Sequence, residues 1–252
     1  MKMKLLIILL LSFTVSGIRA QQFVSKAVIE YEVKTNIKKT MGDSRWAEMM
    51  GDKLPQFKTG YYTFSFADNK SLYKFDRWDE KATLPEFLRK SDEEAAWYFD
   101  HNQGTFNMQK NVFGSNFNVQ DSIIPIEWKL SNENRVIAGY NCRKAVGKIM
   151  DSVYVFAFYT DEIMISGGPC SISGLPGMIL GMTIPRMYGS WIATKVSVEK
   201  VDPATIKPVT AKTYLTVKAL RKTVVDRSKE WNNTDDPESK RWIEQFMWGT
   251  ML

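Results

Sequence analysis

The stretch from Gly167 to Met182 constrains the backbone most strongly, because it holds five glycines and two prolines in sixteen residues. Within it, Leu175-Pro176-Gly177-Met178 fits a type II turn, since proline presets φ near about −65° and glycine accepts the positive φ of the third position. Met178-Ile179-Leu180 then forms a short apolar run between glycines, which predicts a buried strand entered through a tight corner. The helix start and the lysine of a phosphate-binding loop are missing, so we interpret the stretch as a structural corner.

A two-residue period of apolar side chains predicts strands through most of the chain. In the first of them, Ile29, Tyr31 and Val33 share one face and two glutamates lie on the other, which indicates a half-buried strand. The pattern predicts about ten antiparallel strands in a mainly β fold, a curved sheet that forms a half-barrel or incomplete barrel. The strand segments are 27–34, 61–66, 71–75, 97–99, 105–108, an edge strand in 111–118, 124–130, 135–138, 148–159, 178–180, 190–198 and 213–217.

A helix is expected near residues 236–248, at the end of the chain. Asp236 is a suitable cap and Pro237 a suitable first-turn residue. Trp242, Ile243, Phe246 and Met247 fall on one helical face, which predicts packing onto the sheet. Two weaker patterns precede it: a short helix or ordered loop in 40–51, and a charged, mobile insertion over 76–94 in which residues 85–89 could form one helical turn.

The first twenty residues resemble a cleaved secretory signal peptide. A basic start precedes an apolar run from Leu5 to Val15 that is too short to span a bilayer, and small residues follow before Gln21. We therefore expect a single β domain over residues 21–252, exported to the periplasm or outside the cell, with no transmembrane segment after cleavage. Cleavage removes three cations and lowers the net charge from +6 to +3, so nucleic acid is not expected as a partner.

Cys142 and Cys170 are the only cysteines of the chain. Two thiols in an oxidising compartment commonly pair, so the sequence predicts a disulfide between them. A reactive thiol is the alternative and would need a basic neighbour such as Arg143 or Lys144. His101, the one histidine, would have to serve a catalytic cysteine, and it lies in a predicted turn beside an aspartate.

A set of short motifs in fixed order resembles the GLPGLI family of secreted Gram-negative proteins. Gly174-Leu175-Pro176-Gly177-Met178-Ile179 is similar to the naming hexapeptide, with Met178 in place of leucine. The upstream matches are Trp128-Lys129-Leu130, residues 137–145, Phe158-Tyr159-Thr160 and Gly168-Pro169, and departures occur at Phe158, Ile163-Met164 and Cys170. The resemblance implies an exported, mostly β protein and transfers no established biochemical activity.

The first functional hypothesis is a non-catalytic binding protein. Aromatic side chains on the concave face of the sheet would hold a peptide, a lipid or another hydrophobic cargo. A role beside an outer-membrane uptake receptor is compatible with export. The candidate ligand-binding residues are Tyr62, Phe64, Phe66, Trp97 and Trp128.

Two further classes of function stay open as alternatives. A hydrolase would use carboxylates among Asp76, Asp79, Glu80 and Asp100, although no spacing compels a shared site. A copper site would use the thioethers of Met178, Met182 and Met187, although packing into the core is the stronger account of these methionines. The sequence assigns no catalytic residue, no cofactor and no metal site.

Overall fold

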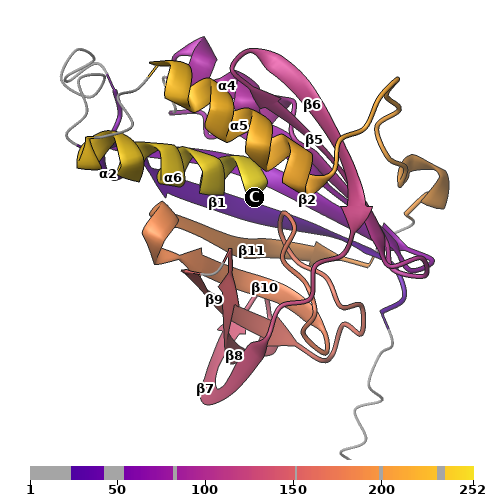
Figure 1. Ribbon diagram of the computed structural model, residues 1–252. Coiled ribbons are helices and arrows are strands. Elements are labelled where there is room, and N and C mark those ends of the chain that lie inside the picture. The colour runs from indigo at the N-terminus through magenta and orange to yellow at the C-terminus, as the bar shows by residue number, and fades with distance from the viewer. Residues whose placement is uncertain (1–23, 43–53, 82–83, 151, 199–200, 232–235) are drawn as a thin grey trace, which may run out of the picture.

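A computed structural model describes residues 24–42, 54–81, 84–150, 152–198, 201–231 and 236–252 (Figure 1). The predicted signal peptide and most of the segment 40–51 lie outside the described residues. The strands are β1 (Ala27–Asn36), β2 (Phe57–Ala67), β3 (Lys70–Trp78), β4 (Ala96–Asp100), β5 (Thr105–Val112), β6 (Ser115–Ser122), β7 (Trp128–Ile137), β8 (Tyr140–Ile149), β9 (Val153–Thr160), β10 (Met178–Ile184) and β11 (Gly189–Ser197). The helices are α2 (Ile37–Met41), α4 (Glu86–Glu93), α5 (Val217–Trp231) and α6 (Pro237–Met251), with 3-10 turns η2 (Pro185–Met187) and η3 (Pro203–Thr205).

All eleven strands belong to one sheet with the order β6-β5-β4-β3-β2-β1-β11-β10-β9-β8-β7. Every neighbouring pair is antiparallel, and the N-terminal and C-terminal meanders join where β1 pairs with β11. The sheet is not closed, because β6 and β7 are its two edges. The predicted fold class, a curved antiparallel sheet with a C-terminal helix, is confirmed.

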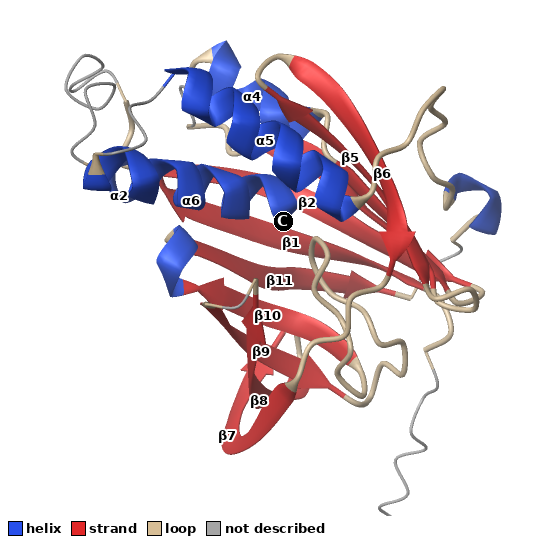
Figure 2. Ribbon diagram, in the orientation of Figure 1, coloured by secondary structure: helices blue, strands red, loops and turns tan. Residues whose placement is uncertain are grey.

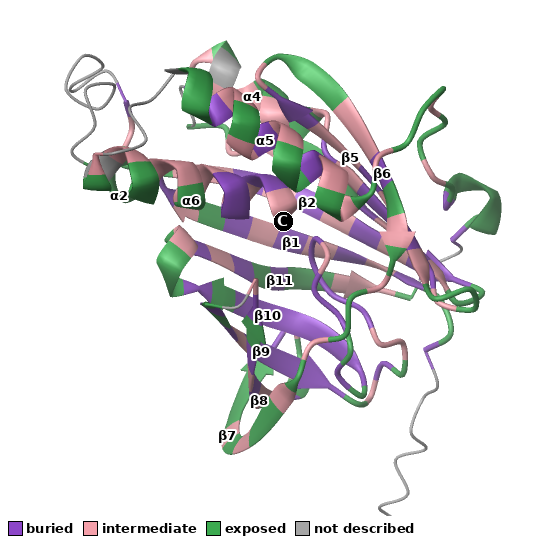
Figure 3. Cartoon of the chain, viewed as in Figure 1, coloured by how far each residue is buried: buried purple, intermediate pink, exposed green. Residues whose placement is uncertain are grey.

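The core lies on the concave side of the sheet. Ile29, Tyr31, Phe64 and Tyr73 are fully buried there, and burial alternates along β1 and β2 as the two-residue period predicts (Figure 3). Figure 2 shows α5 and α6 lying across the concave side of the β1–β6 half, while β7–β9 curl away below them. None of the described helices is long and apolar enough to cross a membrane.

The sequence predictions missed one helix and shortened another, and the structure shows what forms each of them. The predicted strand at 213–217 is a single bridge between Leu215 and Val119, and a helix starts immediately afterwards. Its start is capped by Thr216, whose Oγ1 accepts a hydrogen bond from Ala219 N. Among residues 217–230 of the helix, only Leu220 and Val224 are fully buried apolar residues. The expected insertion over 76–94 instead holds the end of β3 and the helix α4.

The corner at Pro176 differs from the predicted type II turn. Gly177 N donates to Leu175 O at 2.8 Å, which closes a three-residue turn, and Met178 N donates to Ile163 O at 3.1 Å. Gly177 has φ +146°, and a Cβ at this position would lie 2.1 Å from Thr160 O. Glycine is therefore required by close backbone approach, and the buried strand β10 follows as expected.

The predicted disulfide is not formed, because Cys142 and Cys170 are both free and buried. Cys142 Sγ donates to Tyr140 O at 3.6 Å on β8, whereas Cys170 lies near Lys110 and Trp191. Burial raises the pKa of each thiol to about 12, so both are protonated and unreactive at neutral pH.

We predict that Gly177→Ala lowers the free energy of unfolding by about 3 kcal/mol, because the new methyl group must displace the Thr160 carbonyl or distort the corner. Urea unfolding measures the change. The control is Gly114→Ala, at another positive φ (+75°) with nothing within 4 Å of the added carbon, and it should cost about 1 kcal/mol. Equal losses in the two variants would contradict the close-approach explanation.

Candidate ligand-binding cleft

The aromatic residues proposed from the sequence as a ligand-binding face form the protein core. The exposed fraction is 5% for Tyr62, 0% for Phe64, 1% for Phe66 and 2% for Trp97. Trp128 is half-buried, and its Nε1 donates to Ser173 O at 3.0 Å. None of the five lines the large cleft described next. The two-residue period of apolar side chains identifies the face of a strand that points inward. It does not reveal which other elements pack over that face.

A cleft of about 520 Å³ opens where the first turn of α5 and the end of α6 meet the loops below them. These two helices contact each other, and Figure 1 shows the start of α5 beside the C-terminus. Most of the lining is aliphatic, aromatic or thioether, with four polar or charged side chains. The lining residues are Phe99, Phe106, Ile123, Ile124, Pro125, Ile126, Glu127, Lys148, Ile149, Met150, Ser171, Ile172, Val217, Arg221, Met247 and Met251.

The linker between β6 and β7 supplies five consecutive lining residues, 123–127. Its start is fixed because Ile123 N donates to Gly104 O at 2.9 Å. Its end is fixed by packing: a Cβ on Gly147 would lie 2.8 Å from Ile126 Cγ2. This wall of the cleft is therefore held by β5 at one end and by β8 at the other.

The first turn of α5 is attached to the edge strand β6. Leu215 N donates to Asn118 O at 2.8 Å and Gln120 N donates to Leu215 O at 2.9 Å. At the first residue of the helix, Val217 N donates to Asp121 Oδ2 at 3.0 Å, so a carboxylate lies at the positive end of the helix dipole. These bonds hold Val217 and Arg221 at the cleft.

The end of α6 is attached to the sheet by Lys110, a half-buried lysine on β5. Its Nζ donates to Gly249 O at 2.8 Å and lies 5.0 Å from the centre of the Trp97 ring. Burial lowers the pKa of Lys110. The lysine thus satisfies a carbonyl that has no partner within the helix, and it places Met247 and Met251 at the cleft.

Positive charge exceeds negative charge at the cleft. Lys148 and Arg221 are exposed cations and Glu127 is an exposed carboxylate. Neither cation forms an ion pair within the described part of the chain. Ser171 adds a hydroxyl group, so the lining presents a few polar groups around a mainly apolar surface.

Of the four carboxylates proposed for a hydrolase, Asp76, Asp79 and Glu80 lie at or just after the end of β3, whereas Asp100 lies beside its start. Lys70 pairs with Asp100 in the β3–β4 ladder, so Asp100 lies at the start of β3, whereas Asp76 lies six residues further on, about 20 Å away along the strand. Asp100 Oδ1 accepts hydrogen bonds from the amides of Asn102 and Gln103, and Asp76 pairs with Arg77. These acids shape turns and surface contacts.

The methionines proposed for copper and the single histidine lie in places where packing accounts for them. Met178 and Met182 are fully buried in β10, and Met187 ends η2. His101 stacks on Phe99, with ring centres 5.8 Å apart. Among the described residues, no group of three or more histidine, cysteine, aspartate and glutamate side chains could hold a metal ion.

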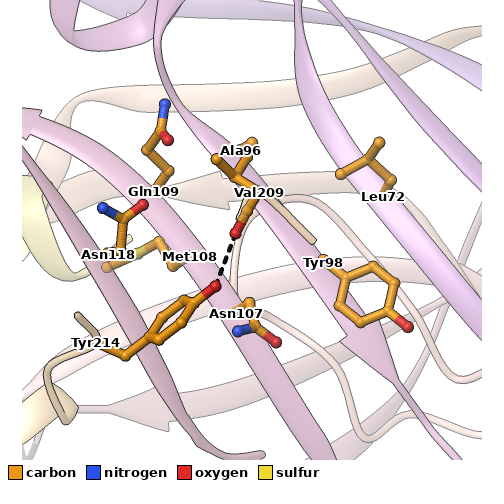
Figure 4. A pocket seen from close by; sticks show the side chains of 9 residues that line it. All are labelled: Leu72, Ala96, Tyr98, Asn107, Met108, Gln109, Asn118, Val209 and Tyr214. Atoms are coloured by element: carbon orange, nitrogen blue, oxygen red, sulfur yellow. Dashed lines mark hydrogen bonds between the residues drawn. The ribbon is translucent and has the colours of Figure 1, made fainter. Parts of the chain in front are cut away.

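A second hollow lies on the convex side of the sheet, beneath the segment that leads to α5 (Figure 4). Its volume is about 10 Å³, room for one water molecule. Tyr214 Oη donates to Val209 O at 3.0 Å across its mouth. Val201 and Ile206 of the same segment pack near Tyr98, so this segment closes part of the convex face and leaves no ligand-sized space at this hollow.

Comparison with known proteins gives one family match. Residues 79–222, more than half of the chain, match the model described as N-glycanase peptide, N-terminal domain. No curated protein matches the chain. The matched range includes Gly174–Ile179 but does not test the resemblance to the GLPGLI family, which stays a prediction.

Solved structures that align with this chain include PNGF-II in the P21 and C2 space groups. They are 14% and 16% identical, with TM-scores of 0.49 and 0.48, and each alignment covers 76% of this chain. The chain spans 32% and 31% of the length of PNGF-II in the two structures. An uncharacterised conserved protein from Thermus thermophilus is 8% identical with a TM-score of 0.38, over 75% of this chain and 88% of that one.

We predict that Lys110→Met increases amide hydrogen exchange in the last turn of α6 by about tenfold, since Gly249 O loses its charged donor. Lys240→Met, on the exposed side of the first turn of α6, is the matched control and should leave that exchange unchanged. Equal exchange in the Lys110 variant and the parent would show that packing alone holds the helix end.

Stability should fall on acidification because of His101. Burial lowers its pKa below the usual 6.5, so in mild acid the unfolded chain binds a proton that the folded chain resists. The loss begins as the pH falls through about 6.5 and stops growing below the folded-state pKa. His101→Gln should remove this component from urea unfolding curves measured across that range, and a parent and variant with parallel pH profiles would refute it. No other histidine complicates the measurement, because the chain has only one.

Proposed function

This chain belongs to the family described as N-glycanase peptide, N-terminal domain, and from that premise we propose that it is a non-catalytic binding or accessory domain that holds a hydrophobic ligand. The family description makes such a domain one part of an enzyme. An accessory role is consistent with that position. The ligand would lie in the cleft between α5, α6 and the β6–β7 linker.

The observation that carries the proposal is the cleft itself. Its volume of about 520 Å³ falls within the range of about 300–1,000 Å³ that is common for small-molecule sites. Such sites are mostly apolar with a few polar groups that fix orientation, and this lining has that composition. The hydrolase alternative lacks comparable support, because Asp100 on β4 lies far from the other candidate acids at the end of β3 and none of the four lines the cleft.

The proposal includes export. The basic start and short apolar run of residues 1–20 support a cleaved signal peptide, and the motif Gly174–Ile179 supports a relation to the secreted GLPGLI proteins. In this setting the domain would work in the periplasm or outside the cell. A partner such as an outer-membrane uptake receptor fits that location.

Filling the cleft should weaken the binding of a neutral apolar probe. The parent should bind N-phenylnaphthylamine at one saturable site, with an increase in probe fluorescence. Ile123→Trp places an indole in the lining and should weaken the affinity by about tenfold or more.

Ile192→Trp is the matched control, since Ile192 is 40% exposed on β11 and does not line the cleft. Its affinity for the probe should equal that of the parent. Circular dichroism checks that both variants keep the fold. Probe affinity unaffected by Ile123→Trp, or no saturable binding to the parent, would defeat the proposal.

A further inference from the structure

Two cations without a carboxylate partner reach the same apolar cleft. Lys148 comes from the end of β8 and Arg221 from the second turn of α5, and both line the cleft. Neither is paired with a carboxylate in the described part of the chain. Two elements far apart in sequence therefore bring positive charge to one place.

Some of the neighbouring cations on the same strand and helix are paired with carboxylates. On β8, Arg143 pairs with Asp161 at 2.8 Å and Lys144 pairs with Glu133 at 2.5 Å. On α5, Lys222 pairs with Asp226 at 2.6 Å. Lys148 and Arg221 differ from these paired cations in having no carboxylate partner among the described residues, and from other unpaired cations, such as Lys218, in lining the cleft.

The rest of the lining suits a flexible aliphatic chain. Ile149, Ile172, Phe106 and Met247 are buried at the cleft, and Met150 and Met251 add thioethers. Methionine side chains adapt to irregular apolar shapes because they are unbranched and polarisable. A bound aliphatic chain would gain the usual hydrophobic stabilisation on leaving water.

A peptide backbone suits this lining poorly. Each buried peptide group needs a hydrogen-bond partner, and an unpaired one costs several kcal/mol in apolar surroundings. Apart from the two cations, the polar lining side chains are the hydroxyl of Ser171 and the carboxylate of Glu127. The excess of positive over negative groups likewise favours a ligand whose polar part is a small anion.

We infer that the cleft binds an amphiphile with a single aliphatic chain and an anionic head group, a free fatty acid. Lys148 and Arg221 bind the carboxylate and the apolar lining buries the chain. The inference rests on the proposed function and specifies its ligand class. Arg221 contributes a planar guanidinium that matches the geometry of a carboxylate, and Lys148 contributes a second, compact charge.

Calorimetric titration with decanoate and with its neutral amide, decanamide, tests the inference. The parent should bind decanoate about tenfold more tightly than decanamide, because the two ligands differ in head-group charge. In K148Q/R221Q this preference should vanish while the affinity for decanamide stays that of the parent. The control K129Q/K218Q removes two exposed cations that do not line the cleft and should keep the preference.

The possible results distinguish a failure of the fatty-acid inference from a failure of the proposed function. A parent that binds acid and amide equally, or a K148Q/R221Q variant that keeps the preference, would overturn the fatty-acid inference and leave an apolar cleft. A parent that binds neither ligand nor N-phenylnaphthylamine would overturn the proposed function as well. Tighter binding of an uncharged apolar peptide than of decanoate would make the cleft a peptide site and also overturn the inference.

Discussion

The short connection between the two edges of the sheet determines the shape of the molecule. Only residues 123–127 join β6 to β7, and six residue steps reach about 20 Å. In a flat sheet, eleven strands at about 4.8 Å spacing would separate these edges by about 48 Å. The two edge strands, β6 and β7, run in the same direction. The linker must therefore join the end of β6 to the start of β7, which lie at opposite ends of a flat sheet. The sheet can satisfy both conditions only by twisting and curling until its edges converge at one end, where Figure 1 shows the linker.

The ordinary twist between neighbouring β-strands produces that curvature. A twist of about 20–25° between neighbours accumulates to more than half a turn across ten pairings. Register shifts in four of the pairings, β1–β11, β9–β10, β2–β3 and β7–β8, increase the local twist. Gly181 assists the curl, because a Cβ there would lie 2.7 Å from Ile137 Cδ1 at the end of β7. The resulting concave face must be covered, and α5, α6 and the segment before β10 cover it.

The sequence predicts the part of the structure that depends on local pattern. Alternation along Ile29, Tyr31 and Val33 identified a real core strand, and the cap at Asp236 correctly marked the start of α6, where its side chain accepts from Ser239 N. The helix α5 was missed because its buried residues are few and widely spaced among lysines and arginines. The corner at Gly177 was recognised as a glycine position, but its conformation is set by Thr160, on a different strand. The disulfide prediction was wrong, because two cysteines can both be buried in one core and stay unpaired.

The cleft could not have been found from any local pattern, since its lining comes from six separate parts of the chain. Phe99 and Phe106 resemble ordinary strand residues, and residues 123–127 resemble a simple connector. They meet only because the sheet curls and because Lys110 and Asp121 attach the two helix ends to β5 and β6. The cleft is an extension of the core, because five of its lining residues, Phe99, Phe106, Ile149, Ile172 and Met247, belong to the buried core cluster. The exposed lining side chains, such as Glu127, Lys148 and Arg221, could vary in size and charge without disturbing that core, so one fold can serve different ligands by changing the exposed part of its cleft.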